Sequence, residues 1–316
     1  MKIIAVDGFT VDPEIQHWSA FETLGHLMVH DRTMPQEVLA RCREAEVLLT
    51  NKVKFQREHF EQLPQLRYLG VLSTGTNVVD IKAASDHGVV VTNVPAYSTD
   101  SVAQLVMSYI LHFSFKVAKH HERVQAGDWV RCQDFSFTCG PLTEIKGKTL
   151  GIIGLGHIGQ KVAALGQAFG MKVLGYSRSP KNISGIDFVS LAKLLQESDF
   201  ISLHCPLNAD TESIICKQSL DQMKCSAILI NTGRGPLVHE VDLAEALNSG
   251  RIAGAACDVL SCEPPLANNP LLSARNCVIT PHIAWATVEA RARLLAIASG
   301  NLKCFLEGQP KNVVNG

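Results

Sequence analysis

The chain has 316 residues, of which 46% are hydrophobic, and a formal net charge of −1 at pH 7. This length predicts two domains, and a balanced charge without any basic block argues against nucleic acid or an anionic membrane as a partner. Ten cysteines are scattered through the chain without a CxxC pair. They argue against a metal site or a disulfide framework and favour reduced thiols in a cytoplasmic protein.

The first hundred residues alternate short β-rich segments with helix-like segments. The expected strands are Lys2–Asp7, Leu27–His30, Val47–Thr50, Tyr68–Leu72 and Val89–Thr92. Such alternation predicts a parallel sheet with helices on both faces. The apolar run Ser101–Phe115 follows. It is too short and too polar to span a bilayer, and it predicts a long, largely buried helix.

A second series of strand and helix signals begins at Thr149. Its six expected strands are Leu150–Ile153, Lys172–Tyr176, Phe200–His204, Ala227–Asn231, Gly254–Val259 and Cys277–Thr280. This series predicts a doubly wound nucleotide-binding domain. An amphipathic helix at Thr287–Leu306 predicts that the chain then returns to the first domain. We therefore expect an α/β protein with two Rossmann-like domains, in which a dinucleotide-binding domain, residues 100–282, is inserted into a flavodoxin-like substrate domain, residues 1–99 and 283–316.

The segment Thr149–Gly159 has the pattern of a dinucleotide-binding turn. A short apolar strand leads into Gly154-x-Gly156-x-x-Gly159, and a helix-like run follows. The first glycine allows a tight turn, the second lets the backbone approach a diphosphate, and the third allows close packing of helix and strand. The diphosphate would lie at the start of the helix. This context favours a dinucleotide site over a purely structural turn.

Polar groups follow three later strands at the sheet edge where such domains bind ligands. Arg234 lies between two glycines after one strand, and Asp258 and Glu263 follow the next. His282 follows a third strand. Each residue alone would be an ordinary surface or turn residue. Together, and downstream of a nucleotide-binding turn, they predict an active site.

These residue types suit the reduction of a 2-oxo acid. Hydride transfer to a carbonyl leaves oxyanion character that needs a proton, which a histidine can donate near neutral pH. A neighbouring carboxylate would orient the imidazole ring and favour its charged form. The planar fork of an arginine matches a substrate carboxylate with two hydrogen bonds. No metal ion is needed for this chemistry, and none is expected.

Over essentially its full length the chain resembles the D-isomer-specific 2-hydroxyacid dehydrogenases, and among them most the glycerate dehydrogenases, or hydroxypyruvate reductases. The matching segments are Gly70–Asp80, Asn93–Tyr97, Ser101–Gln104, Gly154–Gly159, Leu203–Leu207, Asn231–Gly235, Asp258–Glu263 and Pro281–His282. The resemblance implies an NAD(P)-dependent enzyme acting on a small 2-oxo or 2-hydroxy acid, with hydroxypyruvate and D-glycerate favoured and glyoxylate or D-lactate left open. It also implies a homodimer, for which the long apolar helix with Phe113 and Phe115 would supply the interface.

The resemblance implies a role for each catalytic residue. Arg234 would hold the substrate carboxylate and carbonyl, His282 would donate the proton, and Glu263 would hydrogen-bond His282 and keep it protonated. Backbone amides in a glycine-containing turn of the first domain would also cradle the carboxylate. The expected substrate-binding residues are therefore Ser73, Thr74, Gly75, Arg234 and His282.

The resemblance also implies a set of cofactor-binding residues. They are Gly154, Gly156, His157, Ile158, Gly159, Ser177, Arg178, Cys205, Pro206, Thr211, Thr232 and Asp258. Residues His157 and Ile158 would meet the diphosphate at the helix start. The nicotinamide half would contact Thr232 and Asp258, the latter through the carboxamide.

One position departs from the NAD-preferring relatives, which usually carry an acidic residue after the second strand of the nucleotide domain. Ser177 stands there, 23 residues (177 − 154) after Gly154. Serine does not repel a 2′-phosphate, and Arg178 or Ser179 could contact one. We therefore expect NADP preference or dual use. The alternative is that Arg178 is solvated or stacks on adenine while NAD still binds.

A non-catalytic function is the second possibility. The same fold and triad occur in a family of transcriptional corepressors that resembles these dehydrogenases, in which the nucleotide tunes assembly. Those proteins carry a long disordered tail, whereas this chain shows no such tail after the helix that ends near Leu306. We therefore favour the enzyme.

Overall fold

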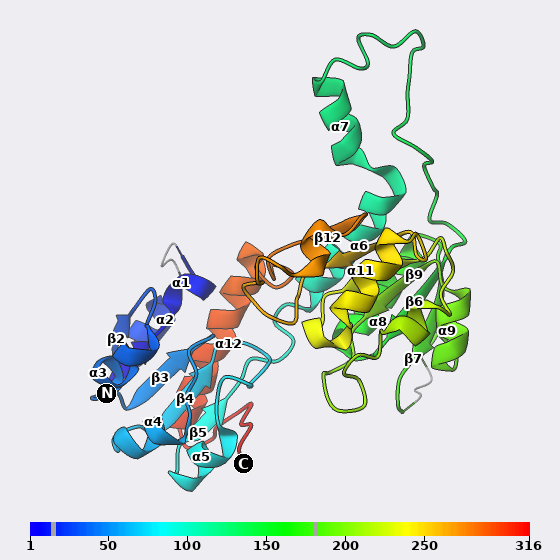
Figure 1. The fold of residues 1–316 in the computed structure, drawn as a ribbon. Coiled ribbons are helices and arrows are strands. Elements are labelled where there is room, and N and C mark those ends of the chain that lie inside the picture. Colours follow the sequence, from blue (N-terminus) through cyan, green and yellow to red (C-terminus); the bar gives the residue numbers. More distant parts are fainter. Residues whose placement is uncertain (14–16, 180–182) are drawn as a thin grey trace. The chain divides into compact units, whose positions relative to one another are not determined.

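The computed structural model describes residues 1–13, 17–179 and 183–316. The chain divides into two compact units (Figure 1). Unit 1 comprises Met1–Ser98 and Trp285–Gly316, and unit 2 comprises Thr99–Ala284. Both units are α/β, as the alternation of strand and helix signals predicts.

Unit 1 is built on a five-stranded sheet in the order β2-β1-β3-β4-β5, and all neighbouring strands pair in parallel. Its strands are β1 (Lys2–Ala5), β2 (His26–Val29), β3 (Val47–Thr50), β4 (Tyr68–Val71) and β5 (Val90–Thr92). Its helices are α1 (Gly8–Val11), α2 (Ser19–Glu22), η1 (Pro35–Glu37), α3 (Val38–Cys42), α4 (Arg57–Gln62), α5 (Ile81–Asp86) and α12 (Val288–Leu306). This strand order is that of flavodoxin-like folds.

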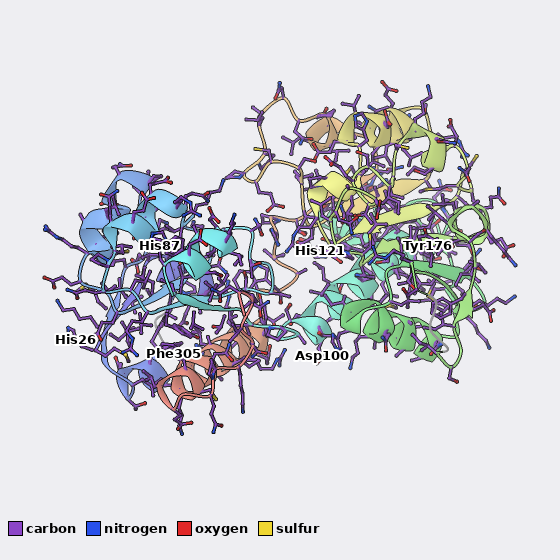
Figure 2. The ribbon with its side chains drawn as sticks, turned by 90° about the horizontal axis from the view of Figure 1, so that it is seen from below. His26, His87, Asp100, His121, Tyr176 and Phe305 are labelled. Carbon is purple, nitrogen blue, oxygen red and sulfur yellow. The ribbon has the colours of Figure 1, made fainter. Side chains whose placement is uncertain are left out.

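The last helix returns to the sheet of unit 1. The ring of Phe305, on α12 and labelled in Figure 2, lies 5.0 Å from the ring of Tyr68 on β4. Leu294, Leu295 and Leu302 of the same helix are buried in the core that covers this face. Burial of these apolar side chains explains why a helix far along the chain completes the first unit.

Unit 2 is built on a seven-stranded parallel sheet in the order β12-β11-β10-β9-β6-β7-β8. Its strands are β6 (Thr149–Ile153), β7 (Lys172–Tyr176), β8 (Asp187–Phe188), β9 (Phe200–Leu203), β10 (Ile228–Asn231), β11 (Gly254–Cys257) and β12 (Cys277–Ile279). Its helices are α6 (Thr99–Phe115), α7 (Val117–Gln125), α8 (His157–Ala168), α9 (Leu191–Glu197), α10 (Lys217–Leu220), η2 (Gly235–Leu237), α11 (Glu240–Asn248) and η3 (Pro270–Ser273). All six expected strands are present, and β8 adds a short seventh at the edge. Because strand order reverses between β6 and β9, a crevice for ligands is expected at the carboxyl ends of these two strands.

Two hydrophobic cores cover the two faces of this sheet. Successive residues of β10 alternate between them, Leu229 in one core and Ile228 and Ile230 in the other. Alternation of this kind follows from the two-residue period of a strand. Residues of α9, α10 and α11 complete the first core, and residues of α6 and α8 complete the second.

The segment after α6 does not take part in either core. None of the residues of α7 is buried, and α7 extends away from the sheet of unit 2 before a long loop returns (Figure 1). Large apolar side chains are exposed along this segment, which we call the arm (residues 117–142). They are Val117, Trp129, Val130, Phe135 and Leu142. The expectation that Phe113 of α6 lies at a dimer interface is wrong, because its ring packs inside unit 2 against Gly254 of β11.

Within the described residues, no helix combines the length and apolar character that a bilayer crossing requires.

Candidate active site

The glycine-rich turn lies at the reversal point of the unit 2 sheet. Gly154 directly follows β6 and has φ +98°, a conformation that residues other than glycine rarely adopt. A Cβ at Gly154 would lie 2.4 Å from the amide nitrogen of Cys205, which follows β9. A Cβ at Gly159 would lie 2.1 Å from the carbonyl oxygen of Gly154. Both glycines are therefore required by close approaches within the protein.

Gly156 is different, because a Cβ at this position would meet no protein atom within 4 Å. The residue stands at the N-cap of α8 in extended conformation. The amides of the first turn of any α-helix lack acceptors within the helix, and they carry its positive dipole end. Open space before such amides fits a diphosphate at His157 and Ile158, so the residues suit a dinucleotide.

The segment after β9 forms one turn containing three of the residues expected around the cofactor. Cys205 lies against Gly154, and the hydroxyl of Thr211 donates to the carbonyl of Pro206 at 2.7 Å. The adjacent imidazole of His204 lies 2.8 Å from the Ser202 hydroxyl, and burial lowers the pKa of His204 to about 4. This turn therefore presents no cationic side chain from His204 at neutral pH.

Ser177, and not an acidic residue, follows β7 where the adenosine ribose is expected. The hydroxyl of Ser177 donates to the carbonyl oxygen of Ser179 at 2.9 Å. The guanidinium of Arg178 is 87% exposed, and its nearest ionic partner, Asp210, lies 3.9 Å away. Exposed pairs at such a distance are weak, so Arg178 is available to an anionic ligand.

The His282 and Glu263 side chains form a close pair in unit 2. Nδ1 of His282 lies 2.6 Å from Oε2 of Glu263, and Oε1 of Glu263 accepts from the amide of Leu260 at 3.0 Å. Burial by itself would raise the pKa of Glu263, but the hydrogen bonds from His282 and Leu260 and the charge of Arg234 outweigh it, so the pKa is lowered. A carboxylate on Nδ1 leaves Nε2 of His282 for a reactant.

The loop that carries Arg234 is held by a buried amide side chain. Asn231, at the end of β10, accepts from the amide of Gly233 at 3.0 Å and donates to the carbonyl of Arg234 at 2.9 Å. Next to it, a Cβ at Gly235 would lie 2.0 Å from the carbonyl carbon of Leu260. Glycine therefore lets the Arg234 loop pack directly on the Glu263 loop. The Arg234 side chain itself remains exposed.

Asp258 organises the residues around His282. Its side chain is buried, and it accepts from the Thr280 hydroxyl at 2.5 Å and from the amides of Ile283 and Ala284 at 2.8 Å each. Burial raises the pKa of Asp258, and these hydrogen bonds only partly offset the effect. A carboxylate has about four acceptor positions, so one remains free, as the expected contact with a carboxamide requires.

The backbone of His282 adopts φ +53°, a left-handed conformation that costs a residue with a Cβ about 1–2 kcal/mol. Its amide donates to the carbonyl of Asp258 at 2.8 Å. The same amide also bonds the carbonyl of Thr280 at 2.9 Å, so Asp258 and Thr280 together hold this conformation. Asp258 also holds the two residues that follow.

The hydroxyl of Thr232 is buried, and the described residues offer it no hydrogen-bond partner. Buried polar groups are nearly always paired, so an unpaired hydroxyl at the end of β10 fits a polar group of the bound cofactor. Thr232 therefore suits the contact with the nicotinamide half that the sequence predicts.

The expected carboxylate-binding turn belongs to unit 1 and follows β4. The Ser73 hydroxyl donates to the carbonyl of Gly75 at 2.6 Å, and the Thr74 hydroxyl donates to the carbonyl of Val94 at 2.8 Å. The amide of Val94 donates in turn to the carbonyl of Ser73. These bonds tie the turn to the segment after β5, so its backbone has a defined shape.

Residues 107–284 match the family described as D-isomer specific 2-hydroxyacid dehydrogenase, NAD binding domain. The chain belongs to this family. It is similar to hydroxypyruvate reductase of Blautia hydrogenotrophica, 45% identical over 100% of both chains. It is also similar to glycerate dehydrogenase of Methylorubrum extorquens, 39% identical over 89% of this chain and 88% of the relative. The solved structure of an acyclic imino acid reductase in complex with NADPH and D-Arg superposes with a TM-score of 0.88, at 32% identity over 99% of this chain and 100% of the other.

Family membership confirms the resemblance inferred from the sequence motifs. As a member of the family, the chain is an oxidoreductase that acts on the CH–OH group of hydroxy acids with a nicotinamide cofactor. The two-sheet α/β architecture agrees with this assignment.

Several residues that support the site carried no recognisable sequence signal. Glu240, at the start of α11, accepts from the amide of Ser261 at 2.7 Å and from the side chain of Asn269 at 2.8 Å, and thereby holds both sides of the Glu263 loop. The hydroxyl of Tyr109 lies 2.5 Å from that of Thr280. Both contacts join residues far apart in the chain, so no local motif could have revealed them.

The glycine turn makes a testable distinction. Gly156→Ala should lower the free energy of unfolding by about 1 kcal/mol at most, because the new methyl group meets open space and the loss is that of replacing glycine by alanine, a poorer N-cap residue. The dissociation constant for the cofactor should rise by roughly tenfold or more, because the methyl group obstructs a charge-assisted hydrogen bond.

Gly159→Ala is the matched control. Its methyl group would overlap the Gly154 carbonyl, so this variant should lose about 1–3 kcal/mol in denaturant unfolding. Fluorescence titration with NADH and NADPH measures the binding. Unaltered cofactor affinity in Gly156→Ala would contradict the proposed position of the diphosphate.

Proposed function

We propose that this chain reduces hydroxypyruvate to D-glycerate, reversibly, with NADPH preferred or with NADPH and NADH both used. The observation that carries the proposal is the His282–Glu263 pair, 2.6 Å apart, on a loop packed directly against the one that bears Arg234. The 45% identity to a hydroxypyruvate reductase over the whole chain supports this substrate.

In the proposed reaction, His282 supplies one proton and Arg234 binds the carboxylate of the substrate. A bound reduced nicotinamide supplies the hydride for the 2-oxo carbon. Arg234, exposed and cationic, binds the substrate carboxylate with its two parallel donors. His282 donates from Nε2 the proton that the developing oxyanion takes up, and it accepts that proton in the reverse direction. Glu263 holds Nδ1 and thereby orients the ring.

The two units have separate roles in this proposal. Unit 2, approximately residues 100–282, binds the dinucleotide at the end of β6 and supplies the proton donor. Unit 1, approximately residues 1–99 and 283–316, supplies the backbone amides of Ser73, Thr74 and Gly75 to the substrate carboxylate. The glycine and the bonded side chains of that turn support this role, since they leave the amides accessible and their orientation defined.

The environment of β7 supports the proposed preference for NADPH. Among the described residues, the exposed guanidinium of Arg178 has one ionic partner, Asp210, at 3.9 Å, and Ser177 brings no negative charge to the 2′ position. Arginine is well suited to bind a phosphate with two hydrogen bonds.

We also propose that the chain forms a homodimer through the arm. Side chains as large as Val130 and Phe135 are 91% and 90% exposed there, and α7, on which Figure 2 labels His121, buries none of its own residues. An apolar hollow of about 380 Å³ lies between Phe115, Val124 and Phe137 on this arm. A second copy would remove these surfaces from water.

A cytoplasmic location is part of the proposal. All ten cysteines fall within the described residues, and all ten are free thiols. Such a composition suits a reducing compartment. Cell fractionation with antibody detection would test it.

The substrate assignment predicts a ranking of 2-oxo acids. Across hydroxypyruvate, glyoxylate, pyruvate and bulkier acids, kcat/KM should be highest for hydroxypyruvate, measured by the absorbance of the reduced cofactor.

His282→Ala should lower kcat by about 10²–10⁴-fold, the usual contribution of a general acid, while cofactor affinity changes little.

Glu263→Gln serves as the matched variant, because it keeps the shape of the partner but removes its charge. The kcat of Glu263→Gln should lie between that of the wild type and that of His282→Ala. Full turnover in His282→Ala would refute the proton-donor assignment. Absence of turnover with every acid and both cofactors would favour the nucleotide-sensing regulator instead.

Cofactor choice can be reversed at one position. Ser177→Asp should raise KM for NADPH by roughly tenfold or more, because the new carboxylate repels the 2′-phosphate. KM for NADH should fall or stay unchanged. Arg178→Met removes the cation without adding an anion. It should raise KM for NADPH and leave KM for NADH unchanged. A wild-type kcat/KM more than tenfold higher with NADH than with NADPH would contradict the proposed preference.

The dimer proposal predicts the effect of charges on the arm. The double variant Val130→Glu, Phe135→Glu should elute at the mass of one chain, 34.4 kDa, whereas the wild type should elute at twice that mass in light-scattering chromatography. Val241→Glu, at an exposed apolar residue of α11, is the control and should remain dimeric. A monomeric wild type would refute the proposal.

A further inference from the structure

Tyr109 is a buried tyrosine in the core of unit 2. It lies on α6, and its side chain is 3% exposed. Its hydroxyl is 2.5 Å from that of Thr280, 171 residues further along the chain. Thr280 follows β12 directly and precedes His282 by two residues. A polar group from a core helix therefore reaches the segment that carries the proton donor.

The position of Tyr109 follows from how α6 packs. A Cβ at Gly254, the first residue of β11, would lie 2.6 Å from the ring of Phe113, so this glycine lets α6 approach the strand closely. Tyr109 lies one helical turn before Phe113. Its ring is held in the core formed by α6, α8 and the sheet, and this packing leaves only the hydroxyl to contact Thr280.

The direction of the hydrogen bonds is determined by the carboxylate at the end of the chain of contacts. Asp258 as a carboxylate can only accept, so the Thr280 hydroxyl donates its single proton to Oδ1, at 2.5 Å. Thr280 can then only accept from Tyr109. The three groups therefore form a directed chain, in which Tyr109 donates to Thr280 and Thr280 donates to Asp258. Neighbours in such a chain polarise and strengthen one another.

The Asp258 end of this chain controls the backbone of the proton donor. The Asp258 carbonyl accepts from the amide of His282, and its carboxylate accepts from the amides of Ile283 and Ala284. The amide of His282 also bonds the carbonyl of Thr280 at 2.9 Å, so two consecutive amides depend on the Asp258 side chain and the third is shared between Asp258 and Thr280. The left-handed backbone of His282, with φ +53°, places its ring 2.6 Å from Glu263.

We propose that Tyr109 is a positioning residue for the proton donor. Its hydroxyl, acting through Thr280 and Asp258, holds residues 282–284 so that the His282 ring stays on Glu263 and Nε2 keeps one direction. Tyr109 itself touches neither substrate nor cofactor in this role. The inference rests on the proposed function of His282 and extends it to the core of unit 2.

Tyr109→Phe tests the proposal, because it removes one oxygen atom and keeps the ring in the core. In single-turnover reduction, the rate should fall by about tenfold, as expected when a reacting group loses its alignment. The solvent deuterium isotope effect on this rate should rise, because proton donation becomes slower relative to the other steps. Cofactor affinity should stay within about twofold, because the nucleotide turn is untouched.

Tyr68→Phe is the matched control. Tyr68 is equally buried, and its hydroxyl bonds that of Thr92 at 2.6 Å, but both residues lie in unit 1. Loss of the Tyr68 hydroxyl should lower the free energy of unfolding without changing the solvent isotope effect. Thr280→Val should lower the rate at least as much as Tyr109→Phe, because it also removes the hydroxyl that donates to Asp258. Thr280→Ser keeps that hydroxyl and should retain the wild-type rate. Adding Tyr109→Phe to Thr280→Val should have no further effect, since the two hydroxyls act in series.

The outcomes separate this inference from the proposed function. Suppose that Tyr109→Phe keeps the single-turnover rate and the isotope effect of the wild type while His282→Ala is inactive. This result would overturn the role of Tyr109 and leave the assignment of the proton donor intact. An equal change in Tyr68→Phe, or additive effects of Tyr109→Phe and Thr280→Val, would overturn it as well. Full turnover in His282→Ala would refute the proposed function itself.

Discussion

The arrangement of the site depends above all on the buried carboxylate of Asp258. A buried anion is tolerated only when donors replace the water that it loses. Here those donors are the Thr280 hydroxyl and the amides of Ile283 and Ala284. The chain after β12 must therefore pass closely over the end of β11 to satisfy Asp258, and this course forces the left-handed turn at His282. The electrostatic requirement of one side chain thus determines the backbone of its neighbour.

Two carboxylates lie close to the same histidine in contrasting environments. Burial dominates at Asp258 and raises its pKa, whereas the hydrogen bond from His282 helps to lower the pKa of the more exposed Glu263. Opposite shifts in neighbouring acids separate their tasks. Asp258 holds the backbone of the loop, and Glu263 contacts the imidazole ring. Both follow β11, and their different burial, not their position along the strand, distinguishes them.

Local signals were sufficient for much of this fold. The strands of both sheets and the glycine turn could be predicted from local patterns. These patterns are the alternation of strand and helix signals, short apolar runs and the spacing of glycines, all of which involve residues close together in the chain. The strand β8 was missed, since two residues show no periodicity. Sequence resemblance also nominated Arg234, Glu263 and His282, and the structure brings their loops together. It could not reveal that Phe113 packs against β11 or that Tyr109 bonds Thr280, because those contacts depend on tertiary packing.

The His282–Glu263 pair and the Arg234 loop all belong to unit 2, and Gly235 lets their loops touch without an intervening side chain. The contacts that orient the His282 ring are therefore all made within unit 2. Substitutions within unit 1 replace no residue of these contacts. Evolution can therefore vary unit 1 while every residue that holds the His282 ring stays the same.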